Sequence, residues 1–334
     1  MSVLDLEKTL LQFWNQLEVS SSAEISLRGD VYYSTANEIA KTSLERRVAQ
    51  VLYDQFYMRQ RSPEASRELD GIEDMLPQLR AANATELTWD EAWTVYRHGT
   101  EGRVYVKKGD RSRAAGAGAY ICDEMTGGIP PLGSTVRLRV YPENCQLQAD
   151  FYHSFGRQLV DQYDEFDAVR IYFNVYAHGA ATLLKVISTC LNRYEVPFHF
   201  KTLRKQKQYG RADAAVIYLA RRYFSFAWQL LDEELGQLHS IFHPDVPLFT
   251  KYIMPGVAIA EEPGNGESFG MHRCRLVSEA IVPILPLREL PQSEVIGRIK
   301  TRFENEGLNL ARPYLKAGSI DNFASSHEFQ GGGQ

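Results

Sequence analysis

The chain has 334 residues, and its 37 Lys and Arg against 42 Asp and Glu give a formal net charge of −5. Hydrophobic residues make up 44% and charged residues 24%, a globular composition that excludes intrinsic disorder, collagen-like repeats and coiled coil. The slightly acidic balance argues against nucleic acid as a partner, because nucleic-acid-binding domains usually carry a basic surplus. No apolar run reaches the ~18 residues of a membrane span, so we expect no membrane partner either.

The first 80 residues carry two helical patterns. Apolar side chains recur at helical spacing at Leu6, Leu10, Phe13, Trp14 and Leu17, and again at Leu44, Val48, Val51, Leu52, Phe56 and Tyr57. The Arg61-Ser62-Pro63 stretch and Gly71 interrupt the second pattern. We therefore expect residues 1–88 to form a helical N-terminal subdomain, a candidate for docking a partner or a leader peptide.

Two further features bear on the compartment. The N-terminus lacks the basic start and apolar stretch of a secretory signal. The four cysteines, Cys122, Cys145, Cys190 and Cys274, lie far apart and form no CxxC pair. Both features favour a cytoplasmic protein with reduced thiols.

From about residue 94 the pattern changes to the alternation of β-strands. The expected strands are Arg103–Lys107, Val136–Tyr141, Val169–Val175, Pro197–Leu203, Asp213–Leu219 and Gly256–Ala260. Helices are expected around residues 184–192, between Phe224 and Phe242, and from about Ser268. This order predicts an α+β fold, in which the helical N-terminal part is followed by a mostly antiparallel sheet with packed helices. That second domain would span residues 89–325, and residues 326–334 would form a flexible tail.

Alternation divides each strand into an inward apolar set and an outward set. The outward sets of four strands are rich in cations and tyrosine: Arg103, Tyr105 and Lys107; Arg137, Arg139 and Tyr141; Arg170, Tyr172 and Asn174; His199 and Lys201. One interpretation is the solvated side of an antiparallel sheet, where Arg and Lys are common. The other is an anion site, because Arg matches phosphate or carboxylate bidentately. The strand patterns alone leave both interpretations open. They also leave open whether the anion would be a phosphate or a carboxylate.

Four ordered segments resemble a known family: Arg170–Tyr172, Pro197–Lys201, Tyr209–Tyr218 and Gly266–Cys274. Together they make roughly residues 94–285 similar to the Hop/HrmA-type effector family of plant-pathogenic bacteria. Similar proteins are the lyase subunits of multi-component lanthipeptide and thioamide-peptide pathways in actinobacteria and cyanobacteria. Those subunits look like relatives of phosphothreonine lyases.

The resemblance implies a phosphopeptide lyase that works without metal or cofactor. It would eliminate phosphate from phosphoserine or phosphothreonine of a phosphorylated precursor peptide, giving dehydroalanine or dehydrobutyrine. A separate partner kinase would install the phosphate first. The alternative is an effector-type module that binds a phosphoprotein without catalysis, and such an effector would be secreted.

The resemblance also implies roles for residues of the cationic face. Lys201 would be the base, in a cationic and partly desolvated site of the kind that lowers a lysine pKa from ~10.4 toward ~7–8. Arg170 would stabilise the enolate-like charge. Tyr172 would be the general acid, where phosphothreonine lyases have a histidine in a Lys-x-His strand; His199 and His272 are the alternatives.

Phosphate binding is expected from Arg211, Arg137, Lys107 and Arg273. Arg211 stands beside Asp213, which would hold it in place, although a plain surface salt bridge fits the same pair. Arg273 lies one turn inside a helix that Ser268 caps after a glycine-rich turn, a place suited to an anion or simply to a capped helix. No metal site is expected, because His239 and His243 have no third ligand nearby in the sequence.

Overall fold

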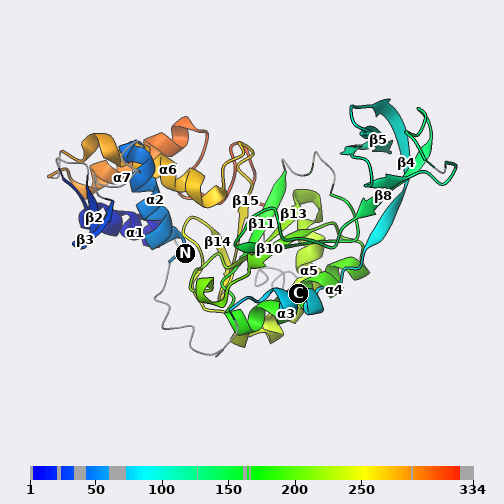
Figure 1. Ribbon diagram of the computed structural model, residues 1–334. Helices are drawn as coiled ribbons and strands as arrows, with labels where there is room; N and C mark the ends of the chain where they lie inside the picture. Colours follow the sequence, from blue (N-terminus) through cyan, green and yellow to red (C-terminus); the bar gives the residue numbers. More distant parts are fainter. Residues whose placement is uncertain are drawn as a thin grey trace, which may run out of the picture.

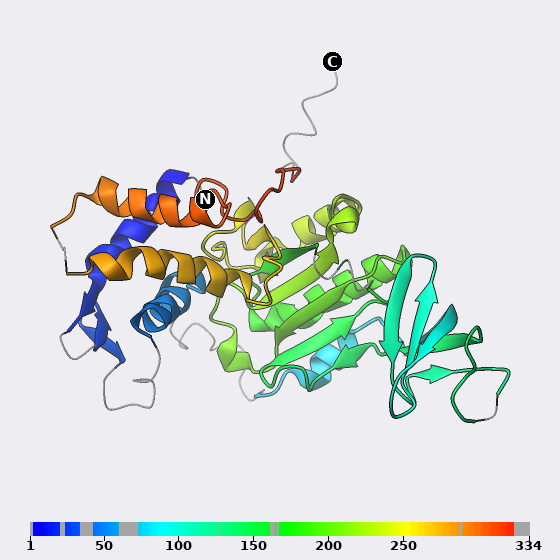
Figure 2. The same ribbon diagram turned by 90° about the horizontal axis from the view of Figure 1, so that it is seen from above.

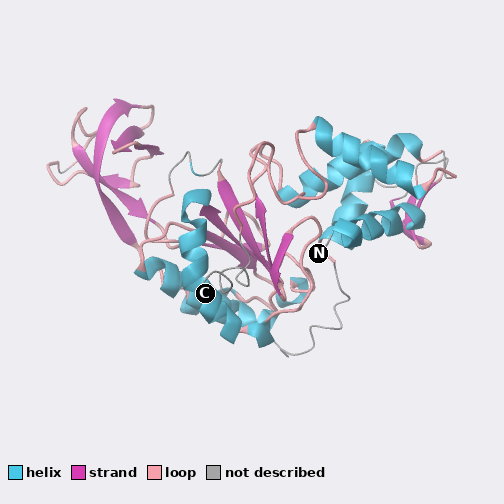
Figure 3. Ribbon diagram, turned by 180° about the vertical axis from the view of Figure 1, so that it is seen from behind, coloured by secondary structure: helices cyan, strands magenta, loops and turns pink. Residues whose placement is uncertain are grey.

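The computed structural model describes residues 3–20, 24–33, 43–59, 73–125, 127–160, 164, 167–286 and 289–323. It has an α+β fold, as the sequence predicted, with a seven-stranded sheet at its centre (Figure 1). A small five-stranded sheet and a helical body lie at opposite ends of this central sheet (Figures 2 and 3). The predicted break at residues 61–63 and Gly71 and the predicted tail 326–334 lie outside the described residues.

The central sheet is antiparallel at every described pairing, with the order β14-β15-β11-β13-β12-β10-β9. Its strands are β9 (Glu143–Asn144), β10 (Phe151–Phe155), β11 (Ala168–Phe173), β12 (His199–Leu203), β13 (Ala215–Ala220), β14 (Lys251–Met254) and β15 (Val257–Glu261). Four of the predicted strands are therefore adjacent, in the order β15, β11, β13 and β12.

Helices cover one face of the central sheet. They are α3 (Leu76–Ala82), α4 (Ala177–Arg193) and α5 (Arg221–Gln237), which lie below the sheet in Figure 1. The inward side chains Val169, Ile171 and Phe173 of β11 belong to one apolar cluster with Leu184 of α4 and Leu231 of α5. Because side chains alternate along a strand, Arg170 and Tyr172 must project from the other face.

The small sheet has the order β6-β5-β4-β8-β7 and its own core. Its strands are β4 (Thr88–His98), β5 (Val104–Lys108), β6 (Arg111–Ala115), β7 (Tyr120–Ile121) and β8 (Thr135–Val140). Two predicted strands, Arg103–Lys107 and Val136–Tyr141, thus belong to this sheet and not to the central one. Alternation identifies the buried side of a strand, but it carries no information about which sheet the strand joins.

The helical body is formed by elements from both the N-terminal and the C-terminal parts of the chain. It contains α1 (Val3–Gln16), strands β1 (Leu17–Val19), β2 (Ile25–Leu27) and β3 (Asp30–Tyr33), α2 (Leu44–Leu52), the π-helix η2 (Tyr53–Tyr57), α6 (Phe269–Ile281) and α7 (Gln292–Asn305). One apolar cluster includes residues of α1, α2, α6 and α7. The helices of residues 1–88 therefore share a core with helices of the expected 89–325 domain. No helix in the described ranges has the length and apolar character to cross a bilayer.

A glycine allows the π-helix to approach α6 closely. A Cβ atom added at Gly270 would lie 2.4 Å from both Cε1 and Cζ of Tyr57, and 2.8 Å from Cε2 of Tyr53. The rings of these two tyrosines stack at 4.9 Å. Ser268 caps α6 just before this contact, as predicted, by accepting from the backbone N–H of Met271.

We expect Gly270→Ala to destabilise the protein. The methyl group would displace two buried rings, and overpacking of this kind costs about 1–3 kcal/mol, more than the ~1 kcal/mol that Ala gains over Gly in a helix. The free energy of unfolding, measured by urea denaturation, should therefore fall. Gly297→Ala in α7 is the matched control, since nothing lies within 4 Å of its added Cβ, and it should gain stability. Equal stability of the two variants would contradict the prediction.

Candidate functional site

The face of the central sheet opposite α3, α4 and α5 carries two parallel rows of side chains, most of them polar, and the helical body packs against part of this face. In the first row, Arg170 pairs with Tyr218, Tyr218 with His199, and His199 with Phe155. In the second row, Tyr172 pairs with Val216, Val216 with Lys201, and Lys201 with His153. Strand neighbours lie about 4.8 Å apart, so the Cα atoms of Tyr172 and Lys201 are separated by about 10 Å, with the small Val216 between them.

Arg170 is buried and paired. Its Nε donates to Glu262 at 2.6 Å and its Nη2 at 2.5 Å. Its Nη1 donates to the Tyr172 hydroxyl at 3.5 Å, and the guanidinium stands 5.2 Å from the centre of the Tyr218 ring. Burial alone would lower the pKa of Arg170, but Tyr172, Tyr218 and Glu262 raise it well above its ordinary value. Arg170 is therefore a permanent charge in the site.

Tyr172 is only 2% exposed. Its oxygen accepts hydrogen bonds from Tyr57, which comes from the helical body, and from Arg170. Burial raises the pKa of Tyr172 to about 12, while Arg170 and the bond from Tyr57 act against that rise. With its oxygen occupied by two donors, Tyr172 keeps its own O–H for a further acceptor.

Arg211 and Asp213 form a bidentate pair on the loop between β12 and β13. Nε lies 2.5 Å from Oδ1 and Nη2 lies 2.8 Å from Oδ2. Tyr53 of the π-helix donates to Asp213 at 3.3 Å and accepts from Arg211 at 3.4 Å. Burial raises the pKa of Asp213, but the charge and hydrogen bonds of Arg211, with the Lys201 charge and the bond from Tyr53, together hold that pKa below its usual value.

Lys201 has no carboxylate within ion-pair distance among the residues that the structure describes. Its Nζ lies 4.6 Å from the centre of the Phe151 ring and 5.9 Å from that of Tyr218. The ammonium group is thus surrounded by ring faces. Its charge acts on His153 and His199, whose pKa values it lowers, and on Asp213.

Two histidines beside Lys201 are bonded to each other. Nδ1 of His153 lies 2.8 Å from Nε2 of His199, and the His199 ring stacks between Phe155 and Tyr218 at 4.8 and 5.0 Å. Burial, with Lys201, lowers the pKa of His153 to about 4; burial, His153 and Lys201 lower that of His199 to about 3. Both rings are neutral at pH 7, so His199, an alternative acid in the sequence analysis, has no proton to spare in the free protein.

The tautomers of this pair follow from its buried end. Nε2 of His153 is buried and has no hydrogen-bond partner. A bare acceptor is tolerated there better than an orphaned N–H. His153 therefore donates its Nδ1–H to His199, and His199 carries its own proton on Nδ1.

Two of the predicted phosphate-binding residues lie elsewhere. Lys107 and Arg137 are on β5 and β8 of the small sheet, where Lys107 is exposed and Arg137 pairs with Asp123 at 2.5 Å. Their prediction assumed one shared sheet face, and the formation of a second sheet separates them from Lys201.

Arg273 and His272 turn toward the C-terminal segment. Arg273 is 0% exposed and donates to the carbonyl oxygens of Pro313 and Leu315 at 2.7 and 2.8 Å. Its remaining nitrogen contacts His272, whose pKa falls to about 4 through burial and the Arg273 charge. Each nitrogen of Arg273 is thus engaged inside the protein, although its charge has no carboxylate partner in the described part of the chain.

Sequence reasoning missed five residues of this face. They are Tyr53, Tyr57, His153, Tyr218 and Glu262. Tyr57 belongs to an apolar helical pattern that marks core, and Tyr218 to a run that looks buried on both faces. The short β10, which carries His153, gives too brief an alternation to be recognised.

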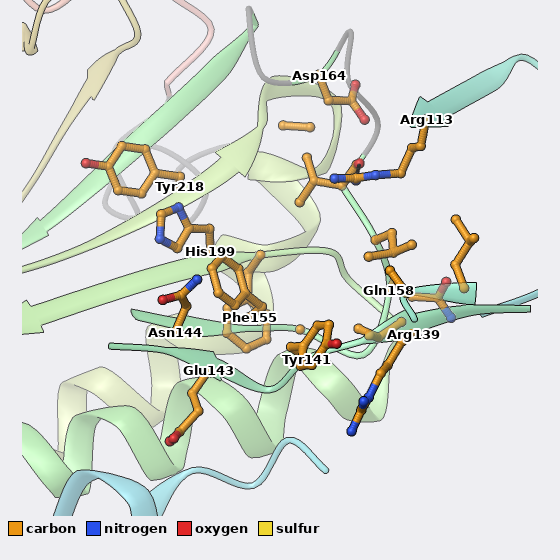
Figure 4. A pocket seen from close by; sticks show the side chains of 18 of the residues that line it. Arg113, Arg139, Tyr141, Glu143, Asn144, Phe155, Gln158, Asp164, His199 and Tyr218 are labelled. Carbon is orange, nitrogen blue, oxygen red and sulfur yellow. Dashed lines mark hydrogen bonds between the residues drawn. The ribbon is translucent and has the colours of Figure 1, made fainter. Parts of the chain in front are cut away.

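A cavity of about 860 Å³ begins at one end of this face. His199, Tyr218 and Glu262 line it on the side of the central sheet, while Arg113 of β6 and Arg139 of β8 line it on the side of the small sheet (Figure 4). Lys201 and Arg170 do not line it. The cavity therefore adjoins the cationic face and does not enclose it.

The histidine pair predicts an acid-dependent loss of stability. An unfolded histidine has a pKa of ~6.5, whereas burial helps to lower the pKa values of His153 and His199 to about 4 and about 3 in the folded protein. Below pH ~6.5 the unfolded chain therefore binds more protons at these two residues than the folded protein does. The free energy of unfolding should fall as the pH drops from about 6.5 through about 4. In the double variant H153Q/H199Q this pH dependence should be weaker, as measured by urea denaturation at a series of pH values.

The exposed His239 supplies the control, because H239Q should leave the slope as it is. The slope, and not the absolute stability, is the readout, since removing a buried pair also changes packing. An unaltered slope in the double variant would show that the pair is protonated in the folded protein.

Comparisons with known proteins come from three searches. No curated protein matches the chain. Two solved structures of effector proteins cover nearly all of it: one from Pseudomonas syringae pv. tomato strain DC3000 (15% identity, TM-score 0.49, 94% of this chain and 98% of that one) and one from Pseudomonas syringae pv. syringae strain 61 (14%, 0.47, 95% and 99%). The model of the HopA1 effector protein family matches residues 143–315, just over half of the chain. The resemblance to Hop-type effectors is thereby confirmed, and the chain belongs to the HopA1 effector protein family.

Proposed function

We propose that the protein is a phosphopeptide lyase. It removes phosphate from phosphoserine or phosphothreonine of a peptide by β-elimination, leaving dehydroalanine or dehydrobutyrine, after a separate kinase has phosphorylated the peptide. The observation that carries this proposal is the placement of Lys201 and Tyr172 on either side of Val216. Lys201 is a cation without a carboxylate partner among the described residues, and Tyr172 is a buried hydroxyl held by two donors.

The charges of the site fit a phosphate monoester. Glu262 balances Arg170 and Asp213 balances Arg211, whereas Lys201 and Arg273 have no carboxylate partner among the described residues. Burial raises the pKa of the partly buried Asp54 carboxyl above its usual value, although the nearby Arg211 charge acts to lower that pKa. A phosphoryl group carries about −1.5 to −2 at neutral pH, so it would offset the remaining positive charge.

The reaction needs three groups in addition to phosphate binding. Neutral Lys201 takes the α-proton, the Cβ–O bond breaks as the Cα–Cβ double bond forms, and phosphate leaves with the proton of the Tyr172 hydroxyl. Arg170 lies beside Tyr172 and stabilises the negative charge that passes through the tyrosine oxygen. Lys201 then releases to solvent the proton that it has taken, and the Tyr172 oxygen takes a proton from solvent. Both residues thereby return to their starting protonation states.

A second candidate is phosphoprotein binding without turnover. It is favoured by the fact that Arg170 and Arg211 are already held by carboxylates and that Tyr172 has a pKa of about 12, far from neutral. Binding needs only the positive charge of the face, whereas elimination also needs proton transfer. The two candidates therefore differ in what Lys201 does.

Lys201→Ala separates them. Loss of a general base typically lowers a rate by about 10²–10⁴-fold, so we expect elimination from a phosphoserine peptide library, measured by mass spectrometry as loss of phosphoric acid, to fall by at least 100-fold. Lys207→Ala, at an exposed lysine in the neighbouring 3₁₀ turn, should retain full activity. If wild-type protein binds the phosphopeptides yet yields no dehydro product, the binding candidate replaces the lyase.

Tyr57→Phe tests the support of the proposed acid. It removes one hydrogen bond to Tyr172 without touching the substrate, and a buried hydrogen bond is worth about 0.5–1.5 kcal/mol. We expect kcat to fall up to about tenfold with little change in KM. Tyr209→Phe is the control, because its hydroxyl bonds Thr202 and the Leu203 carbonyl away from the site. A change in KM alone, or equal effects of both variants, would remove Tyr57 from this role.

A further inference from the structure

The cavity between the two sheets has features that the elimination chemistry does not use. Its volume of about 860 Å³ lies in the range of ligand-binding pockets, roughly 300–1,000 Å³. It lies between β6 and β8 of the small sheet and β10, β12 and β13 of the central sheet (Figure 4). A large substrate would need such a space for the part of it that does not react.

The cavity is continuous with the cationic face through shared residues. Tyr218 lines the cavity and also lies below the Arg170 guanidinium, at 5.2 Å. Glu262 lines it and holds Arg170. The cavity therefore adjoins the place that the proposed function gives to the phosphate.

Its charges are unbalanced. Each carboxylate that lines it within the described residues is paired: Glu143 with Arg80 at 2.8 Å, Asp164 with Arg222 at 2.6 Å and Glu262 with Arg170 at 2.5 Å.

Arg113 and Arg139 also line the cavity and have no carboxylate partner in the described ranges. Arg113 donates to the Val160 carbonyl oxygen, and Arg139 stands 4.8 Å from the centre of the Tyr141 ring with its Nε buried and unbonded. Within the described residues, the lining of the cavity thus includes two arginines that no carboxylate neutralises.

The backbone of β6 is also available to a ligand. Four consecutive residues, Arg113 to Gly116, line the cavity. Successive side chains of a strand point to opposite faces, so a cavity that meets all four lies along the edge of the strand. Within the described residues β6 pairs with β5 alone, which makes it an edge strand of its sheet, and an edge strand can offer N–H and C=O groups to an extended peptide.

We propose that this cavity binds an extended, acidic segment of the polypeptide that flanks the phosphorylated residue. The main chain of the segment pairs with β6, its carboxylates face Arg113 and Arg139, and its apolar side chains rest on the stacked rings of Phe155, His199 and Tyr218. The inference rests on the proposed function for the place of the phosphate, but the segment binds whether or not elimination follows.

The test compares peptides that differ only in their flanks. One set carries Glu and Leu beside a central serine and the other carries Lys and Leu, each with serine either phosphorylated or not. Binding is measured by fluorescence anisotropy with Lys201→Ala protein, which cannot turn the peptide over. We expect the acidic flank to bind at least tenfold more tightly than the basic one in both phosphorylation states, and the difference to shrink as salt is raised.

The double variant R113Q/R139Q should remove this preference. Arg103→Gln is the matched control, because Arg103 is an exposed arginine just before β5 of the small sheet and does not line the cavity. Equal affinity for the two flanks, or a preference that survives in R113Q/R139Q, overturns the proposal.

Two outcomes distinguish peptide binding in the cavity from the proposed lyase activity. If the wild-type protein yields no dehydro product while the unphosphorylated acidic peptide binds through Arg113 and Arg139, the cavity proposal stands and the lyase falls. If dehydro product forms at the same kcat/KM for both flanks, the lyase stands and the cavity proposal falls.

Discussion

The ion pair between Arg170 and Glu262 is the interaction on which the site depends. Arg170 sits on the central strand β11 and is only 8% exposed, so without its partner it would be a buried charge with no compensating carboxylate. Glu262, immediately after the neighbouring strand β15, supplies that partner. With its charge secured, Arg170 can donate to Tyr172 and stand over Tyr218, so one carboxylate organises both rows of the face.

The site is assembled from distant parts of the chain. The central sheet provides the cations, but Tyr53 and Tyr57 come from the π-helix of the helical body, about 150 residues away in sequence from the loop that carries Arg211 and Asp213. The family match begins at residue 143 and therefore includes neither tyrosine. Residues 1–88 thus contribute hydroxyl groups to the site as well as apolar side chains to the core.

Strand alternation predicted the part of this arrangement that is local. It placed Arg170 with Tyr172, and His199 with Lys201, on the outward side of their strands, and these strands lie in one sheet separated only by β13. It failed for Lys107 and Arg137, because the partner of a strand is decided by contacts that are remote in sequence. For the same reason no pattern pointed to Glu262, whose role exists only once β15 lies beside β11.

The π-helix that carries Tyr53 and Tyr57 restricts how the length of this chain can change. A π-turn accommodates one residue more than the corresponding α-turn, and each residue of a helix accounts for about 100° of rotation. A single deletion within Tyr53–Tyr57 would restore regular winding and swing one of the two rings away from its target. Substitutions along this segment leave the winding intact, whereas an insertion or a deletion redirects a hydroxyl group. The segment therefore tolerates a change of residue type far better than a change of length.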